Sequence, residues 1–178
     1  MATRLAVLAL SIVTLSVTLG ACGKQIGDSC LLSSDCSPNG DRVCLCSFCS
    51  GTTLTQTPDQ GYCTVQGCDY STCPDEAVCI RFFTGDFDNR VCDPDTQAGC
   101  SLDEMCAING HCAPRSSEIR YCMSTCDGSG DCRDGYECRD FALAKQHGGE
   151  QVFAPPKPGD KPTPPESQSK FCAAKPPT

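Results

Sequence analysis

The sequence predicts a small, disulfide-rich fold that is mostly irregular, with short β-hairpins, an array of small cysteine-rich modules and little helix apart from the signal peptide. The 178 residues include nineteen cysteines, a density typical of exported domains. The chain has no tryptophan and only 6% aromatic residues, so covalent crosslinks must replace much of an ordinary core. No window beyond the N-terminal segment shows sustained helical periodicity of apolar residues.

The N-terminus predicts export. Arg4 is followed by an uncharged apolar stretch, Leu5–Leu19, which is shorter than the roughly 20 residues needed to span a bilayer. Such a segment is typical of a secretory signal peptide. Its end, Leu19-Gly20-Ala21-Cys22, resembles the bacterial lipobox, in which the cysteine thiol receives a diacylglyceryl group. The resemblance implies a lipoprotein signal peptide over residues 1–21 and lipid attachment at Cys22; cleavage by an ordinary signal peptidase is the alternative.

The number of cysteines agrees with this interpretation. An unpaired thiol in an exported protein needs an explanation, and nineteen is odd. With Cys22 as the lipid carrier, eighteen cysteines remain, enough for nine disulfides. The spacing leaves the connectivity open. The expected disulfide cysteines are Cys30, Cys36, Cys44, Cys46, Cys49, Cys63, Cys68, Cys73, Cys79, Cys92, Cys100, Cys106, Cys112, Cys122, Cys126, Cys132, Cys138 and Cys172.

Residues 22–29 are expected to form the lipidated N-terminus and a tether, and residues 30–140 a modular body. Within the body, triplets of cysteines at similar spacing indicate copies of one unit. The three regular copies are Cys68-Cys73-Cys79, Cys100-Cys106-Cys112 and Cys126-Cys132-Cys138, and Cys30-Cys36-Cys44 is a looser fourth.

Turn-forming pairs lie in the second gap of three copies: Asn39-Gly40, Asn109-Gly110 and Asp134-Gly135. Because Asn-Gly and Asp-Gly tolerate the positive φ angles of tight turns, each pair predicts a small β-hairpin. The segment Pro74–Val78 lacks a glycine, and a helical turn is expected there.

Residues 141–178 form a tail of different composition. Phe141–Val152 is expected to contain a short helix, interrupted by Gly148-Gly149. The proline-rich segment 154–166 predicts extended, polyproline-type backbone, either as a ligand for a proline-binding groove or as a stiff spacer. Since Cys172 is needed for an even number of cysteines, we expect the tail to be bonded back to the body.

No catalytic residue is expected. Gly27-Asp28-Ser29 resembles the nucleophile sequences of trypsin-like and GDSL-type hydrolases, but Cys30 follows the serine and no strand pattern precedes it. The only histidines, His111 and His147, lie in a tight turn and in the tail. Neither position is expected to orient a histidine as the general base of a catalytic triad.

Clustered cysteines and acidic residues raise two other possibilities for chemistry. Cys46-Ser47-Phe48-Cys49 has the C-x-x-C spacing of thiol–disulfide oxidoreductases, which place the pair at a helix N-terminus, whereas no helical pattern follows here. The stretches Asp86–Asn89 and Asp127–Asp131 begin like calcium loops but lack the later ligands of an EF-hand, which leaves calcium binding open. Export favours oxidised cysteines over zinc ligands, so no metal site on the cysteines and no cofactor are expected.

The net charge of −8 argues against nucleic acid as a partner. The expected partners are the membrane, through the N-terminal lipid, and a protein of undetermined identity. Gly23 follows the anchor where aspartate favours inner-membrane retention in some bacteria. We therefore expect a lipid anchor in the bacterial cell envelope, at the outer membrane, with its periplasmic or surface face undetermined.

Further resemblances come from the cysteine spacing. Cys122 to Cys138 has the pattern C-x3-C-x5-C-x5-C, similar to part of the four-disulfide core of whey-acidic-protein inhibitors, although Arg139 replaces the second member of their double cysteine. The other copies are similar to EGF-like modules, and the whole chain resembles cysteine-rich bacterial lipoproteins. The resemblance to lipoproteins implies a location without assigning a reaction. The modular repeats and the absence of a catalytic set favour a non-enzymatic binding, adhesion or structural envelope module. A small protease inhibitor is the alternative, and an envelope thiol–disulfide oxidoreductase using Cys46 and Cys49 is a third hypothesis.

Overall fold

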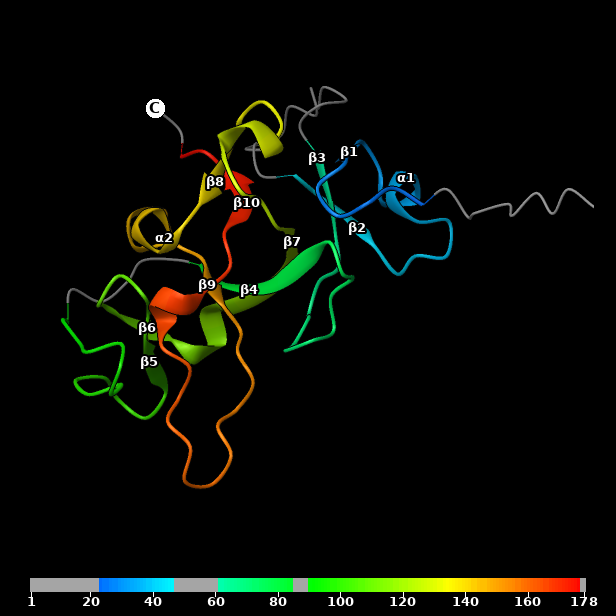
Figure 1. Cartoon of the computed structure of the whole chain (residues 1–178). Coiled ribbons are helices and arrows are strands. Elements are labelled where there is room, and N and C mark those ends of the chain that lie inside the picture. The colour runs from blue at the N-terminus through cyan, green and yellow to red at the C-terminus, as the bar shows by residue number, and fades with distance from the viewer. Residues whose placement is uncertain (1–22, 47–60, 85–89, 177–178) are drawn as a thin grey trace, which may run out of the picture.

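The computed structural model describes residues 23–46, 61–84 and 90–176. Short strands and few helices form the described part (Figure 1), which confirms the predicted fold class. No helix within these residues has the length and hydropathy to cross a membrane. The elements are β1 (Ser29–Cys30), α1 (Ser33–Cys36), β2 (Val43–Cys46), β3 (Gly61–Thr64), β4 (Ala77–Phe83), β5 (Glu104–Cys106), β6 (Cys112–Pro114), η1 (Arg115–Ser117), β7 (Glu118–Ser124), η2 (Ser129–Asp131), β8 (Tyr136–Arg139), α2 (Phe141–His147), β9 (Glu150–Gln151), η3 (Pro165–Ser167) and β10 (Phe171–Ala174).

The strands form four small antiparallel sheets in the described part of the chain. Their strand orders are β1-β3-β2, β7-β4-β9, β5-β6 and β10-β8. The longest pairing joins β4 to β7, from Ala77 opposite Ser124 to Phe83 opposite Glu118. Sheets this small bury little area by themselves, so their stability must come from packing against each other and from crosslinks.

Eight disulfides divide the described cysteines into four units with one connectivity. In every unit the first cysteine bonds to the third, and the second bonds to the fourth. Unit I contains Cys30, Cys36, Cys44 and Cys63; unit II contains Cys68, Cys73, Cys79 and Cys122; unit III contains Cys92, Cys100, Cys106 and Cys112; and unit IV contains Cys126, Cys132, Cys138 and Cys172.

The third and fourth cysteines of each unit lie directly opposite each other on paired antiparallel strands. They are not bonded to each other; each instead bonds to a cysteine of the segment that precedes the strand pair. Two neighbouring strands are thus fastened to the same preceding loop in all four units. The opposed pairs are Cys44 and Cys63, Cys79 and Cys122, Cys106 and Cys112, and Cys138 and Cys172.

The repeat predicted from spacing is correct in three copies and shifted in one. The triplets of units I, II and IV are the first three cysteines of each unit, whereas Cys100-Cys106-Cys112 holds the second to fourth of unit III. Cys92 is the first cysteine there. Unit III also lies between the third and fourth cysteines of unit II, so the array is nested rather than linear.

Only one of the three predicted hairpin turns joins two paired strands. Gly110, with φ of +80°, closes the β5–β6 hairpin, in which its N–H donates to the carbonyl of Ala107. Asn39-Gly40 and Asp134-Gly135 form turns that lead into β2 and β8, whose partners β3 and β10 come much later in the chain. The expected helical turn at Pro74–Val78 is wrong: a hydrogen-bonded turn from Pro74 to Ala77 opens directly into β4.

The tail returns to the body. Helix α2 begins after Asp140, whose side chain accepts a hydrogen bond from the N–H of Leu143, and it ends at Gly148. The chain then pairs through β9 with β4 and through β10 with β8. The Cys132–Cys172 disulfide fixes the end of the tail to unit IV, as the even number of cysteines suggested.

A single principal core runs through the units. Its largest fully buried side chains include Tyr62, Ile80 and Phe171, and buried cysteines fill space between them. The ring of Phe82 packs edge-on against Phe171 with centroids 6.4 Å apart. Disulfides therefore replace part of the apolar volume that the composition lacks, as expected for a chain with so few aromatic residues.

Two aspartates cap equivalent loops in units I and IV. Each directly precedes the second cysteine of its unit. Asp35 Oδ2 accepts the N–H groups of Leu31 and Leu32 at 2.9 Å, and Asp131 Oδ2 accepts those of Asp127 and Gly128 at 2.8 and 3.0 Å. The shared geometry of the two loops explains why an aspartate stands at both positions, since a carboxylate can accept two backbone N–H groups at once.

These caps predict acid sensitivity. Hydrogen bonds from Leu32 and Leu31 lower the pKa of Asp35, and those from Gly128 and Asp127 lower the pKa of Asp131. A carboxyl whose pKa falls on folding stabilises the fold above its unfolded pKa of about 3.9 and loses that contribution as the pH falls through its folded pKa. Thermal unfolding from pH 6 to pH 2 should show a smaller acid-induced drop for D35N/D131N than for wild type. The exposed pair D75N/D103N is the control; an equal reduction there would contradict the assignment.

Candidate functional site

A hollow lies between units I and IV. Its volume is about 680 Å³. Unit I contributes the loop Gln25–Ser29, and unit IV contributes the segment Asp131–Asp134. Ser124 at the end of β7 completes the wall. Segments about a hundred residues apart in sequence therefore meet here, because the core packs β3 against β7 and β8.

Two tyrosines and an arginine form the floor of the hollow. The rings of Tyr62 and Tyr136 stack with centroids 5.2 Å apart. The guanidinium of Arg133 lies over Tyr136, 4.3 Å from its centroid, and 5.7 Å from that of Tyr62. Arg133 Nη2 donates to the carbonyl of Gly61 at 2.5 Å. Such cation–π contacts stabilise the position of the arginine over the two rings.

The floor groups are poorly suited to acid–base catalysis. Burial raises the pKa of Tyr62 well above its usual range, although its hydroxyl accepts the N–H of Ser124 at 2.8 Å. Tyr62 thus stays neutral at physiological pH. Ser29 also lines the hollow, within β1, where it pairs with Tyr62. Neither His111 nor His147 is among the residues that line this hollow.

The rim of the hollow is acidic. Asp28, Asp131 and Asp134 line it, and all three are exposed. Asp28 Oδ2 accepts the N–H of Gln25 at 2.8 Å, and Asp131 caps its own loop as described above. Asp28 and Asp131 are thereby held in fixed positions. Against these three carboxylates the lining contributes one cation, Arg133, and Lys24 Nζ donates to the carbonyl of the lining residue Ser29. The rim therefore favours positively charged groups, whereas Arg133 Nε and Nη1, which are buried without a hydrogen-bond partner among the described residues, favour an acceptor at the floor.

A second cavity, of about 430 Å³, lies beside β4, β9 and the end of α2. It contains an ion pair, Arg81 Nη2 to Glu150 Oε1, at 2.5 Å. Nearby, Glu137 Oε1 accepts from Arg139 Nε at 2.8 Å and contacts His147 Nδ1 at 2.6 Å. Arg139 is only 5% exposed and also donates to backbone carbonyls. These contacts join α2, β8 and β9 to the body, which is a structural role.

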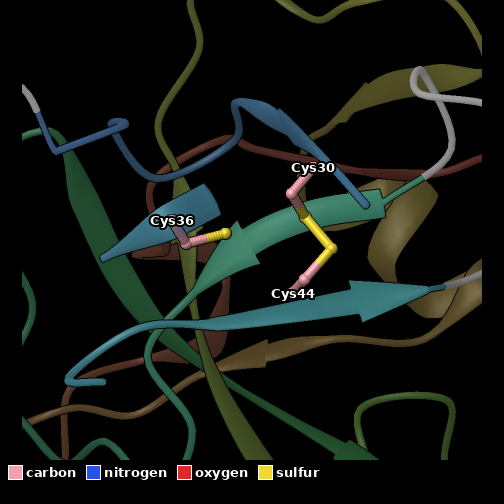
Figure 2. A group of neighbouring side chains, drawn as sticks. All are labelled: Cys30, Cys36 and Cys44. Atoms are coloured by element: carbon pink, nitrogen blue, oxygen red, sulfur yellow. A yellow bond between two sulfur atoms is a disulfide. The ribbon is translucent and has the colours of Figure 1, made fainter. Parts of the chain in front are cut away.

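The predicted cysteine sites divide into bonded and undescribed ones. The sixteen cysteines of units I–IV are all in disulfides. The predicted lipid carrier Cys22, the oxidoreductase candidate Cys49 and the side chain of Cys46 lie outside the described residues. Several cysteine clusters have sulfurs close enough to share an ion, as Figure 2 shows for Cys30, Cys36 and Cys44. Their sulfurs are bonded, however, and a metal requires thiolates.

Two other sequence motifs have a clear place in the structure. The four-disulfide-core-like segment is divided between units, because Cys122 bonds to Cys73 whereas Cys126 and Cys138 bond to each other. In the acidic stretch Asp127–Asp131, the Asp131 carboxylate already accepts two backbone N–H groups. The stretch Asp86–Asn89 lies outside the described residues.

Sequence reasoning did not identify Tyr62, Arg133 or Tyr136. A signal is visible in retrospect: Tyr62 directly precedes the fourth cysteine of unit I, and Tyr136 lies two residues before the third of unit IV. Comparison of the chain with protein-family models, curated proteins and solved structures found no match. Any functional assignment must therefore come from the molecule's own geometry.

Proposed function

We propose that this chain is an exported, lipid-anchored, non-enzymatic binding protein that holds a basic segment of a partner protein in the hollow between units I and IV. The acidic rim above the Tyr–Arg–Tyr floor carries the proposal. Protein partners usually recognise such sites by complementary charge, which gives specificity and speeds association. The net charge of the chain, −8, also favours a positively charged partner.

The disulfides support an extracytoplasmic location. Eight of them crosslink a described body of fewer than 140 residues, a density that reducing cytosol does not sustain. The lipobox-like sequence before Cys22 supports anchoring in a bacterial envelope, at the outer membrane. Intact mass of the natively expressed protein tests this part: a chain that starts at Cys22 with acyl chains attached is expected, and an unacylated chain would contradict it.

Neutralising two of the three rim carboxylates should weaken binding of a basic peptide. The delipidated body is screened against an array of lysine- and arginine-containing peptides, and the dissociation constant of the best binder is measured by fluorescence anisotropy. D28N/D134N should weaken binding about tenfold, which corresponds to about 1.4 kcal/mol.

The matched control D75N/D103N changes the net charge equally but at exposed positions outside the hollow. It should bind like wild type. Equal weakening in both variants would mean that net charge alone attracts the peptide, and the absence of any binding peptide would contradict the proposed site.

One observation favours protease inhibition as a second candidate. The segment 155–164 is exposed and projects from the body as the long orange loop in Figure 1. Its tip is a turn in which Asp160 N–H donates to the Lys157 carbonyl at 2.9 Å. At its base, Ser169 N–H donates to Gln151 Oε1 at 2.6 Å. A projecting loop held at both ends has a shape that can bind in the active-site cleft of a protease.

The inhibitor hypothesis predicts loss of activity on removal of the tip cations. Wild-type protein at micromolar concentration should inhibit a protease that prefers basic residues, and K157A/K161A should not, because both lysines flank the tip of the loop. The control K145A, on α2, should inhibit like wild type. No inhibition of any member of a protease panel by the wild-type protein would exclude this function.

A further inference from the structure

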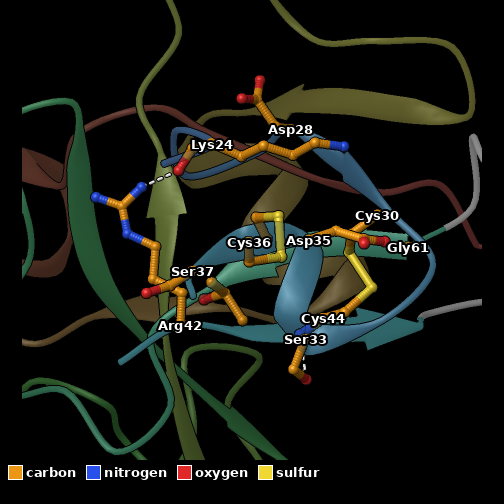
Figure 3. Close-up of a disulfide and its surroundings, with 12 residues drawn as sticks. Lys24, Asp28, Cys30, Ser33, Asp35, Cys36, Ser37, Arg42, Cys44 and Gly61 are labelled. Atoms are coloured by element: carbon orange, nitrogen blue, oxygen red, sulfur yellow. Dashed lines mark hydrogen bonds between the residues drawn. A yellow bond between two sulfur atoms is a disulfide. The ribbon is translucent and has the colours of Figure 1, made fainter. Parts of the chain in front are cut away.

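The residues that follow Cys22 pack directly on unit I instead of forming a free tether. Gly23 lies against the end of α1, since a Cβ on it would be 3.7 Å from the Cys36 carbonyl oxygen. The carbonyl of Lys24 accepts a hydrogen bond from Arg42 (Figure 3). Ile26 is buried in the core at 3% exposure, and Gly27 N–H donates to the Cys63 carbonyl at 2.9 Å.

This packing fixes the distance between the predicted anchor and α1. Consecutive Cα atoms lie about 3.8 Å apart, so the Cα of Cys22 is one such step from Gly23. The headgroup layer on each side of a bilayer is roughly 5–8 Å thick. A body joined to a lipid through so short a link cannot stand clear of that layer.

The exposed apolar side chains of unit I lie at the same helix. Leu31 is 41% exposed and Leu32 is 65% exposed, and Leu32 is the N-cap residue of α1. A helical rise of 1.5 Å per residue puts Leu32 about 6 Å along the axis from Cys36, the residue that Gly23 contacts. The two leucines therefore lie close to the point where the chain leaves toward Cys22.

We infer that the N-terminal end of α1, with Leu31 and Leu32, lies in the headgroup layer of the membrane that holds the Cys22 acyl chains. The inference rests on the proposed lipid anchor and deepens it: the anchor sets the orientation of the body as well as its location. Leucine side chains at this depth gain from burial against acyl chains, which an aqueous tether would not provide.

The charges beside the two leucines are compatible with this orientation. Asp35 Oδ2 accepts hydrogen bonds from the N–H groups of Leu31 and Leu32, which offset part of its charge. Figure 3 shows Lys24 and Arg42 around the same helix, where Lys24 Nζ donates to the Ser29 carbonyl and Arg42 donates to the Lys24 carbonyl. Unit III lies on the opposite side of the molecule, with β5 far from α1 in Figure 1.

The chain contains no tryptophan, so a single introduced one reports its own depth. The full-length acylated protein is prepared as L32W and, as the matched control, as L102W; Leu102 is fully exposed in unit III. Each is reconstituted in phosphatidylcholine vesicles with and without lipid brominated near the top of the acyl chains. Intact mass establishes acylation and complete disulfide formation before the measurement.

We expect brominated lipid to quench the indole fluorescence of L32W about twofold more than that of L102W, because tryptophan near the bilayer settles at headgroup level. Equal quenching in the two acylated proteins would overturn the inference while leaving the anchor intact. An unacylated chain in the mass spectrum would overturn the anchor itself, and the inference with it.

Discussion

Removal of the Cys73–Cys122 disulfide in C73A/C122A is expected to lower the free energy of unfolding by about 4 kcal/mol. The bond joins residues 49 apart in sequence, the longest separation among the described disulfides. The loop that it closes contains all of unit III. Cys122 is fully buried beside the core, so the substitution also leaves a small cavity.

The matched comparison is C68A/C79A, which opens the other disulfide of the same unit. That bond spans only 11 residues, and its loss should cost about 3 kcal/mol. Both variants retain an even number of cysteines in the four units. Guanidinium unfolding followed by tyrosine fluorescence and circular dichroism measures the difference. Equal losses, or a larger loss for C68A/C79A, would show that native-state packing outweighs loop closure in this chain.

The spacing of the cysteines revealed that units repeat but not where each unit ends. The second cysteine follows the first by five to eight residues, and the third follows the second by six to eight, because a local loop sets both distances. The fourth cysteine follows the third by six residues in unit III and by 43 in unit II. The fourth cysteine lies on the strand that pairs with the strand of the third cysteine. Which strand that is depends on tertiary structure, so the cysteine spacing does not predict it.

The same distinction explains the turn predictions. Asn109-Gly110 closes a hairpin because the fourth cysteine of unit III is on the next strand. Asp134-Gly135 has the same local chemistry, but the strand that follows it, β8, pairs with β10, which comes after the proline-rich loop. The hollow was likewise not predicted, since Tyr62 and Arg133 meet only through packing of units I and IV. Local rules predicted turns and crosslink density, and tertiary packing determined the candidate site.

The proposed lipid anchor and the proposed binding hollow have different relations to the sequence. The motif at Cys22 is local and readable, whereas the path of residues 23–27 on unit I is a property of the folded chain. Ile26 illustrates the point. A mostly polar segment with a single apolar residue predicts a tether, yet the side chain of that residue is buried in the core. Burial of Ile26 also positions Asp28 at the rim, so the loop that follows the predicted anchor also lines the hollow.

Substitution of Arg139 by leucine should destabilise the protein by about 3–5 kcal/mol, the range for breaking a buried ion pair on one side. Arg139 Nη1 donates to the carbonyls of His147 and Gly148 at 2.9 Å, and Nε donates to Glu137 at 2.8 Å. Nη2 donates to the Ala174 carbonyl. Burial lowers the pKa of Arg139, which hydrogen bonding to Glu137 opposes. The leucine would leave a carboxylate and three carbonyls without these donors.

Two companion variants separate the contributions of charge and hydrogen bonding. R139L/E137L removes both charges, so it should recover the part of the loss caused by the unpaired carboxylate. It should remain less stable than wild type, because the carbonyls at the end of α2 and of β10 still lack a donor. R115L, at an exposed arginine, is the control and should change stability by less than about 0.5 kcal/mol. Full recovery in R139L/E137L would mean that the backbone contacts of Arg139 contribute nothing. In that case amide hydrogen exchange in α2 and β10 would be as slow in R139L/E137L as in wild type. We expect instead that exchange in R139L/E137L is faster than in wild type, and only in these two elements.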